Sequence, residues 1–283
     1  QVLTSAGAGQ PPAFEAAASS GATSIDGLSD ATTSQSGAST ILGVGSTALD
    51  SASGGGWHTA FGINALTTAT TGVSNVAVGF NSLTTTTTGS SQTAVGTDAL
   101  KLSTTGHYNV AIGASALYNN TTASSNVAVG YNALTANTTG GYSTGIGYRA
   151  LYAQTTGDDN TAIGYSTMLD NTTGIENVAV GSWALQNNTT GEDNCVVGVN
   201  AMRYNTTGDS NVAIGRQALY NNTTANNNVA IGNDALVANT TGEYNIAIGG
   251  NALDANTTAA SNVAIGKNAL TENTTGANNT AIG

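Results

Sequence analysis

The chain has little charge, few aromatic residues, almost no proline and one cysteine, and each shortage excludes a class of protein. Of its 283 residues 7% are charged and 5% are aromatic. Only five are Lys or Arg, too few for a basic stripe, so we expect neither nucleic-acid binding nor cation-mediated membrane attachment. The single cysteine, Cys195, excludes an intrachain disulfide. No hydrophobic run is long enough to span a bilayer, so we expect no membrane insertion of this segment.

What the chain has in place of these is a glycine at every seventeenth residue from Gly45 to Gly283, with no slip. The same motif surrounds each glycine, and residues 211–225 give one copy, NVAIGRQALYNNTTA. An unbroken period without insertions indicates that each unit stacks on the previous one. We therefore predict an all-β, parallel β-solenoid with one turn per 17 residues.

The period divides the chain into two parts. Residues 1–40 are rich in Gly, Ala, Ser and Thr and lack the repeat, which predicts a linker or lead-in. Residues 41–283 carry the repeat and form the predicted solenoid. The chain starts at Gln1 rather than Met and stops within a unit, so we expect it to be a piece of a longer protein.

Within a unit, alternation predicts which side chains face inward. Val212 and Ile214 fall on one side of an extended strand, and Asn211, Ala213 and Gly215 fall on the other. We expect Val212, Ile214 and the following Leu219 to fill a narrow interior, and two short strands with two turns to complete each unit. The segment Asn-Thr-Thr-Gly should form a corner, because glycine permits a positive φ and Asn and Thr can hydrogen-bond the nearby backbone.

Stacking places equivalent residues above one another along a rod of roughly 65–70 Å, if adjacent strands lie about 4.8 Å apart. Asparagine amides in such a column can hydrogen-bond from turn to turn. The predicted columns are Gly164, Gly181, Gly198 and Gly215; Ile163, Val180, Val197 and Ile214; Leu185 and Leu219; and Asn160, Asn177, Asn194 and Asn211.

The repeat NTTGxxNVAIGxxAL resembles a repeat of phage tail-fibre-like proteins and related bacterial surface proteins, as do segments 1–9, 25–31 and 42–45. Its NVAIG core is also similar to the head repeat of trimeric autotransporter adhesins, although the period here is longer. The resemblance implies a left-handed β-roll assembled as a homotrimer, placed outside the cell in a virion fibre or cell-surface filament. Independently, the flat Asn211/Ala213 face of small residues should let neighbouring chains approach closely.

No residues gather into a recognisable catalytic, cofactor or metal site, so we expect a protein that is not an enzyme and needs no cofactor. The acidic pairs fall at variable corner positions and are expected to be solvated. Tyr131, Tyr148 and Tyr165 share the position after the glycine, which makes them candidate surface contacts for a sugar or for another chain.

Three functions remain open from the sequence. The first is the structural shaft of an extracellular or virion fibre that displays or forms part of a surface-attachment device. The second is an adhesin that binds host-surface glycans or other surfaces along its side. The third, and least favoured, is ice binding through the repeated threonines; adjacent threonines point to opposite faces of a strand, which leaves one column for each face.

Overall fold

The computed structural model describes residues 2–4, 13–15, 31–36, 39–49 and 55–283. The sequence segment 25–30, part of the resemblance above, lies outside these residues. The strands are β1 Val2–Thr4, β2 Ala13–Glu15, β3 Ala31–Ser36, β4 Ser39–Val44, β5 His58–Phe61, β6 Val76–Val78, β7 Thr93–Val95, β8 Val110–Ile112, β9 Val127–Val129, β10 Thr144–Ile146, β11 Thr161–Ile163, β12 Val178–Val180, β13 Cys195–Val197, β14 Val212–Ile214, β15 Val229–Ile231, β16 Ile246–Ile248, β17 Val263–Ile265 and β18 Thr280–Ile282.

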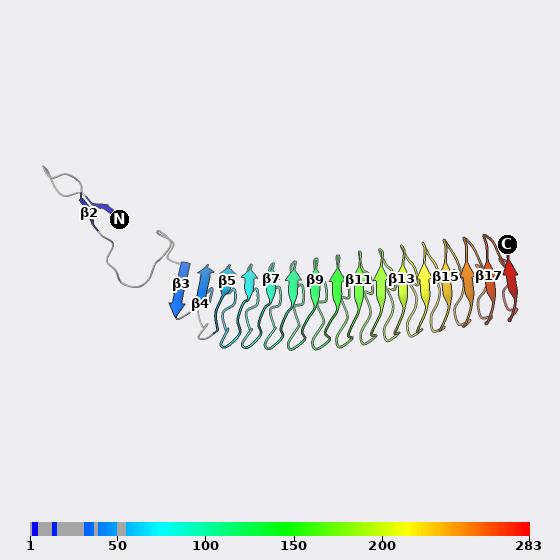
Figure 1. Ribbon diagram of the computed structural model, residues 1–283, viewed down its shortest axis with the longest axis horizontal. Helices are drawn as coiled ribbons and strands as arrows, with labels where there is room; N and C mark the ends of the chain where they lie inside the picture. The colour runs from blue at the N-terminus through cyan, green and yellow to red at the C-terminus, as the bar shows by residue number, and fades with distance from the viewer. Residues whose placement is uncertain (1, 5–12, 16–30, 37–38, 50–54) are drawn as a thin grey trace.

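Strands β4 to β18 form one parallel sheet in which the order of strands follows the order of the chain (Figure 1). Each strand pairs with the next at a shift of one repeat, so that Val197 lies beside Ile214 and Ile214 beside Ile231. The predicted column of Ile163, Val180, Val197 and Ile214 is therefore confirmed. At the amino-terminal edge β3 pairs antiparallel with β4 and covers the end of the sheet.

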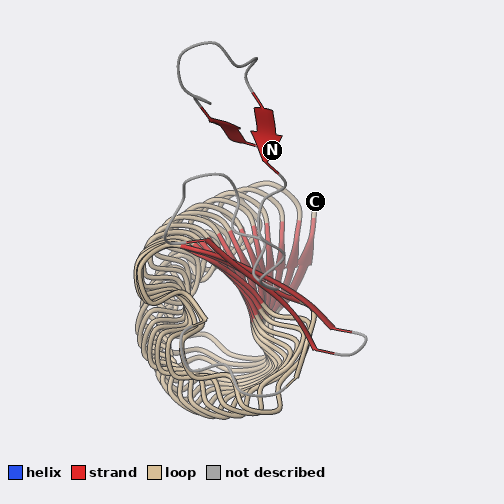
Figure 2. Cartoon of the chain, turned by 90° about the vertical axis from the view of Figure 1, so that its left-hand side faces the viewer, coloured by secondary structure: helices blue, strands red, loops and turns tan. Residues whose placement is uncertain are grey.

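Each turn contains one short strand, not the two predicted. Figure 2 shows the strands side by side along one side of the coil, while turns make up the rest of its outline. The physical reason is the backbone at three positions of every unit, seen at Ser210, Gln217 and Leu219, where φ lies between 53° and 57°. A left-handed residue interrupts an extended strand, so the chain after the glycine turns instead of pairing as a second strand.

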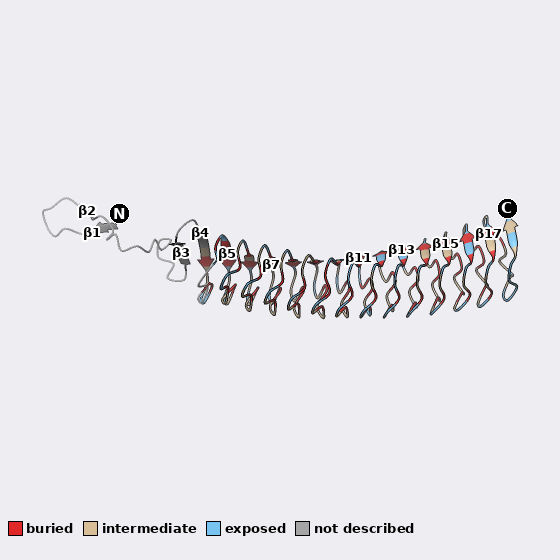
Figure 3. Ribbon diagram, turned by 60° about the horizontal axis from the view of Figure 1, so that its bottom comes forward, coloured by how far each residue is buried: buried red, intermediate tan, exposed pale blue. Residues whose placement is uncertain are grey.

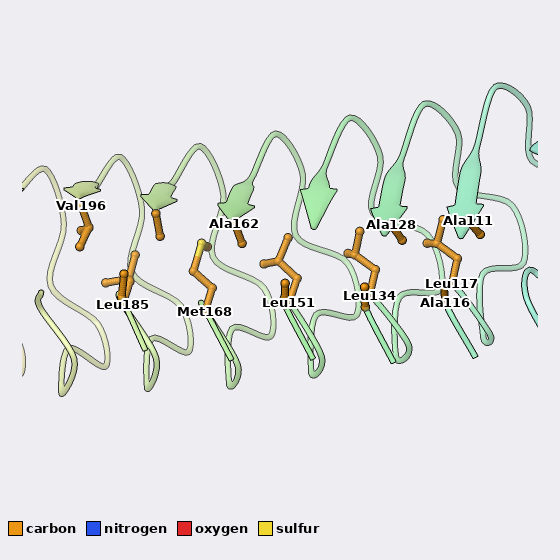
Figure 4. Close-up of a cluster of buried hydrophobic side chains, with 14 of the residues drawn as sticks. Ala111, Ala116, Leu117, Ala128, Leu134, Leu151, Ala162, Met168, Leu185 and Val196 are labelled. Carbon is orange, nitrogen blue, oxygen red and sulfur yellow. The ribbon is translucent and has the colours of Figure 1, made fainter. Parts of the chain in front are cut away.

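The interior is lined by the opposite side of the strand from the one predicted. Ala213 is fully buried, whereas Ile214 leaves 38% of its surface exposed and Val212 is half-buried. Leu219 is fully buried, as expected. Figure 4 shows the same arrangement in earlier turns, where the strand alanines point toward a row of Leu and Met side chains. The expectation that Val and Ile fill the core was wrong, because one Leu per turn already occupies most of a narrow interior.

The buried asparagines determine which side of the strand faces inward. Asn211 Nδ2 donates to Asn194 Oδ1 at 3.1 Å and to the corner carbonyl of Ala225 at 2.9 Å, and Asn222 Nδ2 donates to that same carbonyl at 3.0 Å. Both asparagines are fully buried. Because Asn211 and Ala213 lie two residues apart, they share one side of the strand, and an inward Asn211 turns Ile214 outward. In the turns with both asparagines, from Ala123 to Ala259, the corner carbonyl therefore receives two hydrogen bonds instead of being buried without a partner.

The periodic glycine is required by its backbone conformation. Gly215 has φ 135°, and a Cβ atom added to it would lie 2.4 Å from the carbonyl oxygen of Gly232. No L side chain fits such a position. Among the described corner glycines a positive φ occurs at Gly55, where it is 79°, but not at Gly208, so the prediction of a positive φ at this corner was wrong for most turns. At Gly208 a Cβ atom would instead lie 2.5 Å from the oxygen of Ala225. The corresponding corner positions of other turns carry alanines such as Ala225.

Candidate interaction surface

The inward columns hold the fold together and leave few polar groups for chemistry. Along most turns the interior consists of Ala, Leu and hydrogen-bonded Asn, which Figure 3 shows as buried segments recurring from turn to turn. Among the described residues no group of three or more His, Cys, Asp and Glu side chains is placed to hold a metal ion. Candidate interactions therefore have to be sought on the outer surface of the coil.

The tyrosines predicted as surface contacts form a row along the rod. The ring of Tyr148 stacks between those of Tyr131 and Tyr165, with centroid distances of 5.6 and 5.1 Å, and Trp183 meets Tyr165 edge-on at 5.5 Å. Tyr131, Tyr148 and Tyr165 are 51%, 42% and 48% exposed. Both faces of the middle ring are covered by its neighbours, so the row presents ring edges and hydroxyl groups to solvent and offers little flat surface for a sugar.

One arginine joins this aromatic row and another packs on a tyrosine outside it, contacts that the sequence reasoning missed. Arg203 donates from Nε to Gln186 Oε1 at 2.8 Å, and its guanidinium lies 5.5 Å from the centre of the Trp183 ring. The guanidinium of Arg149 lies 4.2 Å from the centre of the Tyr152 ring. Contacts of this geometry are favourable cation–π interactions. Both contacts join the second and fifth positions after a glycine, which the left-handed residues bring onto one surface.

A second surface consists of the residues that sequence reasoning placed inside. We call it the apolar face and define it as the residues three and one positions before each periodic glycine, from Thr59 and Phe61 to Thr280 and Ile282. The column directly before the glycine contains only Val, Ile and one Phe, and the other contains Val, Thr, Ile and Cys195. Cys195 is exposed, and Val178 and Ile214 are 40% and 38% exposed. No charged residue interrupts either column.

The paired threonines of the corner form two columns with different environments. The first, represented by Thr206, is half-buried, and its hydroxyl donates to the carbonyl of Thr223 in the next turn at 3.0 Å. The second, represented by Thr207, is exposed. One column therefore contributes to the stacking of turns, and the other faces solvent at a corner of the coil.

Shifted pKa values occur at scattered positions and do not define a site. Burial lowers the pKa of His58, which replaces an asparagine of the inner column and whose Nδ1 accepts the backbone N–H of Asn75 at 3.3 Å. A hydrogen bond to Asp193, together with its negative charge, raises the pKa of Glu176. Burial likewise raises the pKa of Asp170, against the opposing charge of Arg149. His58 lies several turns away from Asp170 and Glu176, and each shift has a local cause.

The fold defines the chain as a β-solenoid repeat protein. No family model, curated protein or solved structure matches it. Among the described residues no helix is long and apolar enough to cross a membrane.

Proposed function

We propose that this chain is the rigid structural shaft of an extracellular fibre, on a virion or a cell surface, which displays or forms part of a surface-attachment device. In this proposal three copies associate into a homotrimer, and the shaft has no catalytic role. The resemblance of the repeat to fibre proteins motivates the extracellular location and the number of chains.

The observation that carries the proposal is the continuity of hydrogen bonding along the rod. The backbone N–H of Asn211 donates to Asn194 Oδ1 at 3.0 Å, and the backbone N–H of Asn228 donates to Asn211 Oδ1 at 3.0 Å. A second asparagine column does the same through its side chains, with Asn222 Nδ2 donating to Asn205 Oδ1 at 3.0 Å. A coil in which each turn is tied to the next by backbone, amide and packing contacts resists bending, as a shaft requires.

The aromatic row favours a second candidate, an adhesin that binds host-surface glycans along its side. Trp, Tyr and Arg are the residue types enriched at the energetic centres of protein–protein interfaces, and they combine flat apolar rings with hydrogen-bond donors. Tyr131, Tyr165, Trp183 and Arg203 bring these three types together in adjacent turns. The hydroxyl groups and ring edges of the row suit hydrogen bonding to sugar hydroxyls better than stacking against sugar rings.

Two measurements on the purified chain separate these functions. Electron microscopy should show straight rods of uniform length, roughly 65–70 Å for the solenoid at about 4.8 Å per turn. A glycan array followed by a polysaccharide-hydrolysis assay should show neither binding nor release of reducing sugar. Binding that is lost in a Tyr148→Ala/Trp183→Ala variant would favour the adhesin, turnover of any glycan would refute the non-enzymatic role, and bent or collapsed particles would refute the shaft.

A further inference from the structure

We infer that copies of this chain meet through the apolar face, side by side, parallel and in register. The inference rests on the proposed fibre and deepens it, because it assigns the contact surface and the relative direction of the chains. It also reverses the expectation that the small Asn/Ala side mediates association, since Asn211 and Ala213 are fully buried inside the coil.

The first argument is the size of the apolar face. Ile residues directly before the glycine, such as Ile112, Ile163 and Ile248, are 40%, 38% and 36% exposed. Summed along both columns, this leaves on the order of 1,000 Å² of continuous apolar surface, whereas soluble monomers rarely expose patches of more than a few hundred Å². A stable interface buries about 800 Å² on each partner, so the face is large enough to hold two chains together.

The second argument concerns which partner fits. The face carries one ridge of side chains per turn over the whole length of the rod, because successive strands pair at a shift of one repeat. A partner that fills every groove needs the same spacing over the same length, and another copy of this chain has both.

Charge does not select the partner, but it favours the apolar face as the surface through which two copies meet. The chain has a formal net charge of −11, so two copies repel one another at their acidic positions. The acidic residues Glu176, Asp193 and Asp209 lie outside the two columns of the apolar face, which contain no charged residue. Identical acidic chains can therefore approach most closely where this face is shared.

The direction follows from the position of threonines in the outer column that begins at Thr59. Four of its five threonines lie in the first half of the rod, and every residue from Val178 to Val263 is apolar or Cys195. In a fully overlapping antiparallel pair, Thr93 would face Ile246 and Thr161 would face Val178. Parallel chains in register place threonine beside threonine, where the hydroxyl groups can bond to one another instead of being buried against apolar side chains.

The face is tested by adding charge to it. The variant Ile163→Asp/Val197→Asp/Ile231→Asp places three carboxylates on the apolar face in alternate turns. The control, Thr173→Asp/Thr207→Asp/Thr241→Asp, adds the same charge at the same spacing on the exposed threonine column. Mass photometry of the full chain should show an oligomer for the wild type and the control, and a monomer for the face variant, with equal β-sheet circular dichroism in all three. If the aspartates unfold the chain, the corresponding serine variant replaces them.

The direction is tested through Cys195, which lies on the face in β13. A short bis-maleimide should cross-link wild-type chains to one another through this residue if they are parallel and in register. In a Cys195→Val background, Thr144→Cys should also cross-link, because in parallel chains in register each residue of the face lies opposite the same residue of the other chain. Antiparallel chains would cross-link only in a mixture of wild-type and Thr144→Cys/Cys195→Val chains, since β10 and β13 then face each other.

The outcomes separate this inference from the proposed function. A monomeric wild type, or equal association of the face variant and its control, overturns the apolar face as the contact. Cross-linking confined to the mixture overturns the parallel direction. A monomeric wild type would also contradict the proposed trimer, but each of these results leaves the rigid shaft standing, because the shape of the rod and the absence of turnover test that part of the proposal. An associated particle of three chains supports the trimer, and one of two chains contradicts it.

Discussion

The inner and outer sides of each strand obey different rules although they alternate residue by residue. Inside, the column of Ala213 admits only Ala apart from Gly43, Gly145 and Val196, and all of these are buried except Ala281 in the last strand. Outside, the column of Val212 admits Val, Thr, Ile and Cys. The inner side must fit one leucine per turn and hydrogen-bond the corner carbonyls. The comparison teaches that in a narrow coil uniform size marks the interior better than hydrophobicity does.

The largest expected effect separates the two sides at adjacent residues. Ala213→Asp places a carboxylate in the closed interior without a cation, and we expect it to lower the free energy of unfolding by about 3–5 kcal/mol. The side chain of residue 214 points outward, so we expect Ile214→Asp to lower the free energy of unfolding of dissociated chains by less than about 1 kcal/mol. Chemical denaturation at concentrations low enough to dissociate any oligomer gives both values, with Arg216→Ala as the neutral control. Equal losses for the two aspartates would show that the sides are assigned wrongly.

The next effect tests a compensated pair inside the coil. Where Ser143 replaces an asparagine of one inner column, Gln154 replaces an asparagine of the other, and Gln154 Nε2 donates to Ser143 Oγ at 3.0 Å. Gln154 Oε1 also accepts from Asn160 Nδ2 at 3.1 Å. The shorter side chain of Gln154→Asn should not reach Ser143 Oγ. A buried polar group then lacks a hydrogen-bond partner, and we expect the free energy of unfolding to fall by about 1–3 kcal/mol.

Adding Ser143→Asn should restore the pattern of the other turns and recover most of that loss. A double-mutant cycle by denaturation should then give a coupling of about 0.5–3 kcal/mol between the two positions. Additive losses would mean that the serine–glutamine pair is not a unit.

Much of this fold can be predicted from the sequence, but which side of each strand faces the interior was predicted wrongly. The glycine register, the stacking of Ile163 on Val180 and the asparagine column all follow from an unbroken period. The inward side could not be read from hydrophobicity, because Val212 and Ile214 are the most apolar residues of the strand. Two features favour the Ala213 side as the interior. The residues of the Ala213 column are uniformly small, and the buried corner carbonyls need a hydrogen bond from the side-chain amide of Asn211.

The outer surface was predicted less completely. The common position of Tyr131, Tyr148 and Tyr165 placed them in one column, and the structure stacks their rings. The addition of Trp183 and Arg203 depends on the left-handed turn after each glycine, which a one-dimensional pattern does not reveal.

A smaller effect concerns the one histidine of the inner asparagine column. Burial holds the pKa of His58 below its ordinary value of 6.5, and its Nδ1 accepts a backbone N–H, so the folded chain keeps this side chain neutral. The stability that neutral His58 supports is present above pH 6.5 and is lost as pH falls through the lowered pKa. His58→Asn should therefore reduce the loss of stability between neutral and mildly acidic pH.

Hydrogen exchange around β5 and β6 as a function of pH measures this change. We expect protection of these strands to fall with acidification in the wild type and to change less in His58→Asn, with protection of β14 and β15 as the internal control. Equal acid sensitivity of the two proteins would exclude His58 as its source.

The smallest effect lies on the outer surface, at Glu176. Its raised pKa, caused by hydrogen bonding to Asp193 and by that residue's charge, means that the folded state favours the protonated form. Its contribution to stability therefore increases as pH falls through the raised pKa and is complete below the ordinary value of 4.5. Glu176→Gln should raise the melting temperature slightly at neutral pH, and it should reduce the increase in stability that the wild type shows on acidification. A lower melting temperature for Glu176→Gln would contradict the assigned repulsion.

The spacing of turns tests the solenoid most directly. In a Cys195→Val background, spin labels at exposed threonines can be introduced through Thr105→Cys/Thr207→Cys and Thr105→Cys/Thr258→Cys, which span six and nine repeats. Diluted with unlabelled chains, these pairs should give electron–electron distances near roughly 29 and 43 Å, a constant increment of about 4.8 Å per turn. Distances that do not grow in proportion to the number of repeats would contradict a coil with one turn per 17 residues.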